Sequence, residues 1–160
     1  MNRFVTRSIL AIAVTTALLC PLVMLAQQAS AKPYHEGSVW SIAFIRAKPG
    51  MEDRYQRYLA DQWKSEQEAM KKAGYSLSYK VITTEPHGAQ DFNVILMTEF
   101  KDLATLEANA DKMNALGQQL GGGQPKIETG YQDRASYREV LAERLGREII
   151  LAPKGSAAAK

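Results

Sequence analysis

Cysteine is almost absent from this 160-residue sequence, which has a single residue of that type, Cys20. One thiol leaves no partner for an internal disulfide, and the two histidines show no zinc-type spacing. The sequence also lacks a serine nucleophile elbow and a dinucleotide fingerprint, and its triglycine segment, residues 121–123, lacks the lysine of a phosphate-binding loop. We therefore expect no metal and no cofactor, and we expect packing alone to stabilise the fold.

Acidic residues are absent from the start of the chain. Residues 1–31 hold Arg3 and Arg7 ahead of a long apolar run that ends in Ala29-Ser30-Ala31. Small side chains at the first and third positions before a cut suit signal peptidase. We interpret residues 1–31 as a cleaved signal peptide, which places the mature start near Lys32 and predicts a periplasmic or extracellular protein.

Two other interpretations of this segment stay open. The apolar run approaches the roughly 20 residues that a bilayer span needs, so it can also be read as an uncleaved anchor, although Pro21 interrupts it. Cys20 suggests lipidation, but Leu19 is a poor neighbour for lipid attachment. The arginines near the start are not adjacent, so twin-arginine export has no support.

The net positive charge is small once this segment is removed. The 20 basic residues fall to 18 against 17 acidic ones, and no cluster of lysine and arginine remains. Nucleic acids and anionic membranes recruit such clusters. We therefore expect no nucleic-acid partner, and no membrane partner after cleavage.

The rest of the chain suits one domain. We divide the sequence into a signal peptide at 1–31, a polar lead-in at 32–37, a domain at 38–151, and a tail at 152–160 that has nothing to bury and is expected to be disordered.

Hydrophobic periodicity predicts seven elements within that domain. Apolar residues at steps of three and four indicate helices, and alternation or short apolar runs indicate strands. Predicted strands cover 39–45, 75–81, 92–100 and 148–151, and predicted helices cover 51–73, 103–120 and 133–146, with 124–132 irregular.

The order strand, helix, strand, strand, helix, strand is the split βαβ arrangement, with the first and third strands central. In the third strand, Phe92, Val94 and Leu96 are expected to point one way, and Ile95 and Met97 the other. Helices cover one side only of such a sheet. Two large apolar side chains left in water on the other side would cost about 3–6 kcal/mol, so we expect a second copy of the sheet to cover them.

These segments together resemble the dimeric α+β barrel superfamily, and more closely an exported branch of it. The segments that carry the resemblance are Lys48-Pro49-Gly50, the aromatic-rich helix from Tyr55 to Trp63, the third strand and the closing Arg147-Glu148-Ile149-Ile150-Leu151. The resemblance implies an α+β, ferredoxin-like fold with a four-stranded antiparallel sheet, two main helices and a short C-terminal helix. It also implies a homodimer in which two sheets pair into a barrel, and a pocket between sheet and helices that holds a small apolar molecule.

No residue of the chain aligns with a catalytic motif of that superfamily, so we assign no catalytic residue. Aromatic residues and one amide are the candidates for ligand binding, and the alternative for each is ordinary core packing. The candidates are Trp40, Tyr55, Tyr58, Trp63, Tyr79 and Asn93. His35 and His87 lack a second ligand or an orienting partner at a useful spacing.

The function that we predict is therefore an exported, non-enzymatic homodimer that binds a small hydrophobic or aromatic molecule. The resemblance also leaves an enzyme open, because the superfamily includes cofactor-free monooxygenases, lactone isomerases and haem-degrading enzymes. A cofactor-free enzyme needs no motif, only desolvation and well-placed hydrogen bonds.

Overall fold

Nine helical and strand segments make up the part of the chain that the computed structural model describes, residues 32–153. The predicted signal peptide and the end of the predicted tail, from residue 154, lie outside the described residues. In chain order the segments are β1 (Tyr34–Ala47), α1 (Glu52–Tyr58), the π-helical segment η1 (Leu59–Trp63), α2 (Lys64–Lys72), β2 (Ser78–Thr83), β3 (Val94–Phe100), α3 (Leu103–Gly121), α4 (Gln124–Tyr137) and β4 (Arg138–Leu151).

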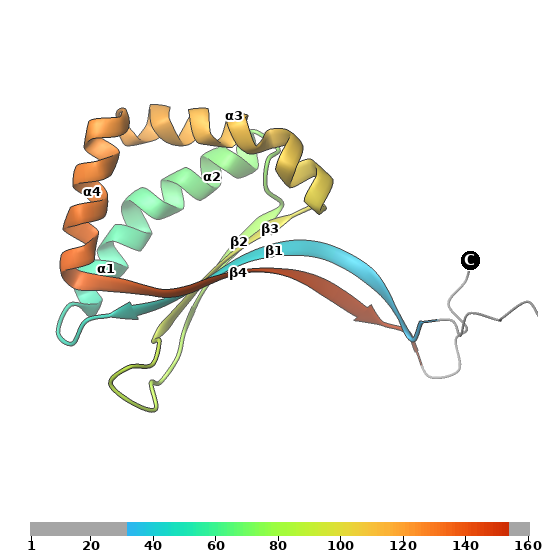
Figure 1. The fold of residues 1–160 in the computed structure, drawn as a ribbon, viewed down its shortest axis with the longest axis horizontal. Coiled ribbons are helices and arrows are strands. Elements are labelled where there is room, and N and C mark those ends of the chain that lie inside the picture. Colours follow the sequence, from blue (N-terminus) through green and yellow to red (C-terminus); the bar gives the residue numbers. More distant parts are fainter. Residues whose placement is uncertain (1–31, 154–160) are drawn as a thin grey trace, which may run out of the picture. The chain divides into compact units, whose positions relative to one another are not determined.

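The four strands form one antiparallel sheet in the order β2-β3-β1-β4. The first and third strands are central and the other two are edges, as the split βαβ arrangement predicts. The helices all lie on one side of this sheet (Figure 1). The predicted α+β class and four-stranded antiparallel sheet are therefore confirmed, and the opposite face of the sheet carries no described helix.

The first predicted helix, 51–73, is present as α1, η1 and α2 in succession. Its sheet-facing residues recur every four positions, at Tyr55, Leu59, Trp63 and Gln67. A regular α-helix has 3.6 residues per turn and would rotate this row away from the sheet. The wider π turn at η1 keeps the row on one side, and Gly74, at φ 75°, ends the helix.

The second predicted helix is α3. Asp102 caps it, with its Oδ1 accepting a hydrogen bond from the Thr105 backbone N–H at 2.6 Å. Gly122 ends it in the left-handed conformation, at φ 74°. No residue of α3 is buried, although its sequence has an apolar ridge.

The third predicted helix is present but lies earlier in the chain. Residues 124–137 form α4, where the sequence analysis placed an irregular segment followed by a helix over 133–146. Pro125 stands at the start of α4, where its missing N–H costs nothing. Beyond Tyr137 the chain is strand, because β4 pairs with β1 along the full length of both.

The ends of β1 and β4 also differ from expectation. β1 begins at Tyr34, which pairs with Leu151, so most of the predicted polar lead-in belongs to the strand. Two charged residues of β4 pair across strands with residues of β1. Glu139 binds Arg46 and Arg147 binds Glu36. Cross-strand ion pairs of this kind support the sheet register.

The core lies where the two central strands meet α1 and η1 and the junction of α4 with β4. Its buried members are Ile45, Ala47, Tyr55, Leu59, Val94 and Tyr137. The strand register places a second apolar set on the outer face of the sheet, away from the helices: Trp40, Ile42, Phe44, Ile82, Ile95 and Met97. We call this set the outer-face patch.

Phe92 belongs with the outer-face patch, so the prediction that it shares a side with Val94 is wrong. β3 begins only at Val94, and the Phe92 ring packs edge-on against Phe44 with centroids 4.9 Å apart. Strand alternation cannot be extended past the residue at which the strand begins. Within residues 32–153, no helix is both long and apolar enough to cross a bilayer.

Candidate functional site

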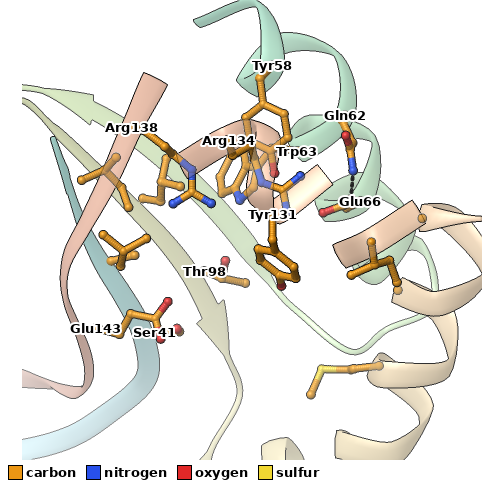
Figure 2. Close-up of a pocket in the computed structure, with 18 of the residues that line it drawn as sticks. Ser41, Tyr58, Gln62, Trp63, Glu66, Thr98, Tyr131, Arg134, Arg138 and Glu143 are labelled. Atoms are coloured by element: carbon orange, nitrogen blue, oxygen red, sulfur yellow. Dashed lines mark hydrogen bonds between the residues drawn. The ribbon is translucent and has the colours of Figure 1, made fainter. Parts of the chain in front are cut away.

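A cavity of about 750 Å³ lies between the helix-covered face of the sheet and the helices. Ser41, Ala43 and Ile45 of β1 and Leu96 and Thr98 of β3 form its floor. α1, η1 and α2 form one wall, and α3, α4 and β4 contribute the roof and the facing wall (Figure 2). Ser41, Ala43 and Thr98 are small, so they leave space that bulkier side chains would fill.

Aromatic rings from the first helix form one wall of the cavity. Tyr55 and Tyr58 stack with ring centroids 5.9 Å apart, and Trp63 continues the wall one turn further on. Tyr131 of α4 lines the cavity from the other side and is 59% exposed. Three of the six residues predicted from sequence as ligand-binding, Tyr55, Tyr58 and Trp63, therefore lie at this cavity.

Tyr79 and Trp40 do not line the cavity. Tyr79 lies behind the aromatic wall, where its ring meets Trp63 edge-on at 5.4 Å and its hydroxyl donates to Glu68 Oε1 at 2.6 Å. Trp40 lies on the opposite face of the sheet, with Lys80 Nζ 5.0 Å from the centre of its ring. Tyr79 thus supports the wall, and Trp40 belongs to the outer-face patch.

Asn93 continues the pairing of the two central strands with its side chain. Its Oδ1 accepts from the Ala47 backbone N–H at 2.8 Å and its Nδ2 donates to the Ala47 carbonyl at 3.3 Å, so the amide mimics a peptide group. Asn93 also lines a second, smaller cavity of about 270 Å³ next to the hairpin loop after β2. Its amide is thus satisfied by protein, and a ligand contact for it stays a prediction.

Tyr55, which lines the cavity, has a buried hydroxyl. The residue is fully buried, and the hydroxyl has no hydrogen-bond partner among the described residues. Burial raises the pKa of Tyr55, although the Arg138 charge acts in the other direction. Burial also raises the pKa of Tyr58, against the opposing charge of Arg134. Both phenols are therefore protonated at neutral pH and are available as hydrogen-bond donors, not as bases.

A hydrogen bond ties the floor to the wall. Thr98 Oγ1 donates to Gln67 Oε1 at 2.9 Å, and both residues are buried. A satisfied buried pair of this kind fixes the helix against the strand. The aromatic wall is thus held in place by polar as well as apolar contacts.

Sequence analysis missed two cavity residues, Arg134 and Arg138. Arg134 lies in the last turn of α4 and is 7% exposed, and Arg138 is the first residue of β4. The sequence signal was misleading, because Arg138 lies within residues 133–146, which were predicted to form a helix. Once β4 begins at Arg138, the register pairs it with Ala47 and turns its side chain toward the helices.

Both histidines lie away from the cavity. His35 is exposed in β1 opposite Ile150, and His87 is exposed in the loop after β2 with its Nδ1 3.8 Å from Asp91 Oδ2. Among residues 32–153, no group of three or more histidine, cysteine or acidic side chains is placed to hold a metal ion.

The fold and the site together define an α+β domain with a ferredoxin-like sheet, helices on one face and a large cavity beneath them. Solved structures similar to this chain include HapK from Hahella chejuensis, at 13% identity and a TM-score of 0.48, covering 76% of this chain and 98% of that one. A NIPSNAP family protein of unknown function from Agrobacterium tumefaciens has 16% identity and a TM-score of 0.46, with 74% and 92% covered.

A dimeric ferredoxin-like protein from an uncultured marine organism is similar at 17% identity and a TM-score of 0.39, with 74% of this chain and 97% of that one covered. These three similar structures are 13%, 16% and 17% identical to this chain. No protein-family model matches the chain, and no curated protein matches it.

Proposed function

We propose that the chain is an exported homodimer that holds a small hydrophobic or aromatic molecule between its sheet and its helices. The observation that carries this proposal is the cavity of about 750 Å³ walled by Tyr55, Tyr58 and Trp63. Small-molecule sites in proteins are typically concave, rich in aromatic side chains and about 300–1,000 Å³ in volume. The cavity has room for a ligand of two or three fused rings.

The loose packing of α3 supports the same proposal. α3 buries none of its residues, and its Met113 and Gly117 line the cavity. A helix with an apolar ridge usually gains its stability by packing that ridge against a core. A bound apolar molecule would supply the surface that the protein itself does not.

The outer-face patch supports the homodimer. Ile42 and Phe44 on β1, with Ile95 and Met97 on β3, are neighbours across the two central strands, on the side without helices. A second copy presents the same apolar surface, so a two-fold axis through this face covers both patches at once. The export step of the proposal depends on residues 1–31, through the apolar run and the small residues before the cut.

Intrinsic fluorescence tests the cavity, because the chain has two tryptophans: Trp63 lines the cavity and Trp40 lies on the outer face of the sheet. A Trp40→Phe variant keeps one tryptophan, the cavity residue Trp63. A Trp63→Phe variant keeps the other, the outer-face residue Trp40. Titration with a neutral naphthalene derivative should quench the first variant strongly and the second weakly, with a Kd of about 1–100 μM.

Each outcome of this titration decides the proposal. Saturable quenching of Trp63 alone supports a ligand in the cavity. Equal quenching of both tryptophans, or no saturable change with any neutral or charged aromatic compound, contradicts it. Circular dichroism of the two variants serves as the control that both are folded.

One observation favours an enzyme as the second candidate. Tyr55 lines the cavity and has a buried hydroxyl without a hydrogen-bond partner among the described residues, and a hydroxyl can donate a hydrogen bond to a carbonyl or quinol oxygen. The purified protein can be incubated with model quinols, and separately with haem and a reductant. Turnover above the buffer rate that is lost in Tyr55→Phe would favour a cofactor-free monooxygenase, isomerase or haem-degrading enzyme over a binding protein.

A further inference from the structure

Two arginines face the cavity without an ionic partner in the part of the chain that the structure describes. The Nε atoms of Arg134 and Arg138 are both buried and have no hydrogen-bond partner among the described residues. The guanidinium groups point into the cavity from the wall formed by α4 and β4 (Figure 2). Within residues 32–153, no carboxylate forms an ion pair with either of them.

Other arginines of the same domain are paired although they are more exposed. Arg54 binds Asp133 at 2.6 Å and Arg147 binds Glu36, and their side chains are 47% and 43% exposed. Arg134, at 7% exposed, is the one for which an unpaired charge is most unfavourable. A buried guanidinium without a protein anion is therefore suited to an anion that arrives from outside.

The position of Arg134 is fixed by its neighbours. Its guanidinium carbon lies 4.5 Å from the ring centre of Tyr131 and 5.0 Å from that of Tyr58, so two aromatic faces hold the cation between them. A glycine one turn earlier leaves it room: a Cβ on Gly130 would come within 3.0 Å of Arg134 Nη1. A glycine inside a helix costs about 1 kcal/mol relative to alanine, and this close approach gives a reason for it.

The remaining charges of the cavity limit the charge of the ligand. Glu66 and Glu143 also line it, and Glu66 accepts a hydrogen bond from Gln62 Nε2 at 3.0 Å. Figure 2 shows Glu143 away from Arg138, beside Ser41. The two arginines lie on one wall of the cavity, and the two acids lie elsewhere in it. This arrangement favours a ligand with one negative charge at the arginine end over a ligand with a doubly charged group.

We propose that the ligand of this cavity is an aromatic monocarboxylate. The carboxylate accepts hydrogen bonds from Arg134 and Arg138, and the ring lies against Tyr58 and Trp63. The planar fork of arginine matches a carboxylate in two parallel hydrogen bonds, which no neutral isostere reproduces. This inference rests on the proposed function, because it names the chemical class of the molecule in the same cavity.

Calorimetric titration with three ligands of one ring system tests the inference. The probes are 2-naphthoate, the uncharged 2-naphthamide and 2-naphthyl phosphate, and the protein is the purified chain. The naphthoate should bind about 10- to 100-fold more tightly than the amide, which is the usual effect of a charge-assisted hydrogen-bond pair. The phosphate should bind more weakly than the naphthoate.

Variants locate the effect. Arg134→Gln and Arg138→Gln should each weaken naphthoate binding about 10- to 100-fold and change amide binding by less than about threefold. Arg57→Gln is the matched control, because Arg57 is exposed on α1 and does not line the cavity. If an arginine variant fails to fold, the comparison of naphthoate with naphthamide on the unaltered chain still decides the question.

The outcomes separate the inference from the proposed function. Equal affinity for naphthoate and naphthamide overturns the carboxylate assignment and leaves the proposed binding function standing. Tighter binding of the phosphate also overturns it, in favour of a dianionic ligand. No binding of any of the three, together with no effect of neutral aromatics on Trp63 fluorescence, overturns both.

Discussion

Tyr55 shows how a single side chain connects the core with the cavity. Its side chain is fully buried in the core cluster and lines the cavity, and its hydroxyl has no hydrogen-bond partner among the described residues. A buried hydroxyl without a hydrogen bond costs about 1–3 kcal/mol, so its retention suggests a use in binding. We therefore expect the Tyr55 hydroxyl to lower the stability of the fold and to raise the affinity for a ligand.

Replacing Tyr55 by phenylalanine tests that contrast. Tyr55→Phe removes the unpartnered hydroxyl and keeps the ring, so the free energy of unfolding should stay the same or rise by up to about 2 kcal/mol. Tyr79→Phe is the matched control, because it removes a hydroxyl that donates a hydrogen bond to Glu68. Its free energy of unfolding should not rise. Urea denaturation monitored by circular dichroism measures both. A clear destabilisation by Tyr55→Phe would show that the hydroxyl has a partner in solution.

The raised pKa of Tyr55 predicts a pH dependence of stability that the Tyr55→Phe variant should lack in part. Burial raises that pKa above its ordinary value, so above about pH 10 the unfolded chain loses the phenol proton first. Deprotonation then favours the unfolded state, and stability should fall as the pH rises beyond 10. The fall should be shallower in Tyr55→Phe, and parallel pH profiles of the two proteins would contradict this.

Residues whose role depends on nearby sequence could be predicted, and residues whose role depends on distant pairing could not. Asp102 and Gly74 act as a cap and a terminator, and residue type alone marks such positions, because Asp favours the start of a helix and Gly its left-handed end. Arg138 required the knowledge that β4 begins there. The spacing of the charged residues around Arg138 is compatible with a helix as well as with a strand. The strand that pairs with it, at Ala47, lies more than 90 residues earlier in the sequence.

The segments differ in how firmly they are held, and α3 is the loosest of the helices that border the cavity. It buries no residue over 19 positions, whereas β1 and β3 contribute several members of the core. Local opening is easiest where few apolar contacts hold an element. α3 is therefore the element whose stability should respond most to a ligand.

Hydrogen exchange measures this difference directly. Amides of α3 should exchange about tenfold or more faster than those of the central strands, because the helix opens locally without unfolding the sheet. Saturation with an aromatic ligand should slow exchange in α3 more than in β2, which does not line the cavity. Equal protection of α3 and β1 in the free protein would contradict a loosely held roof.

The predicted helices and strands were right where the sequence signals at their ends were clear, and wrong near the C-terminus. Helices with an apolar stripe and clear end signals, at 51–73 and 103–120, were found within a few residues. Residues 124–132 and 133–146 were misread, because Tyr137, Val140 and Leu141 are three and four residues apart, which is helical spacing. β4 is also irregular: its pairing with β1 shifts between Phe44 and Ile45, which breaks the alternation typical of a strand.

At the scale of the whole molecule, the outer-face patch should decide the oligomeric state. Sedimentation of the purified protein at micromolar concentration should show a dimer. Ile95→Lys places a charge at the centre of the patch and should weaken dimerisation at least about 100-fold. Glu107→Lys, on the exposed part of α3, is the control for a changed surface charge.

A well-folded monomer of the unaltered protein at that concentration would contradict the dimer. It would also leave the outer-face patch exposed, and the sheet would then need a different cover. The cavity lies on the other side of the sheet, so titrations of Trp63 remain interpretable in either case.

The long β1–β4 ribbon brings together the two ends of the domain. The Ala152 N–H donates to the Pro33 carbonyl at 2.8 Å, beside the pair formed by Tyr34 and Leu151. A short turn could join these positions and convert the two strands into a hairpin, and new termini could be opened in the loop at residues 84–91. Such a rearranged gene would begin at β3 and end at β2, and it would encode the same sheet, with the cavity walls in a different chain order.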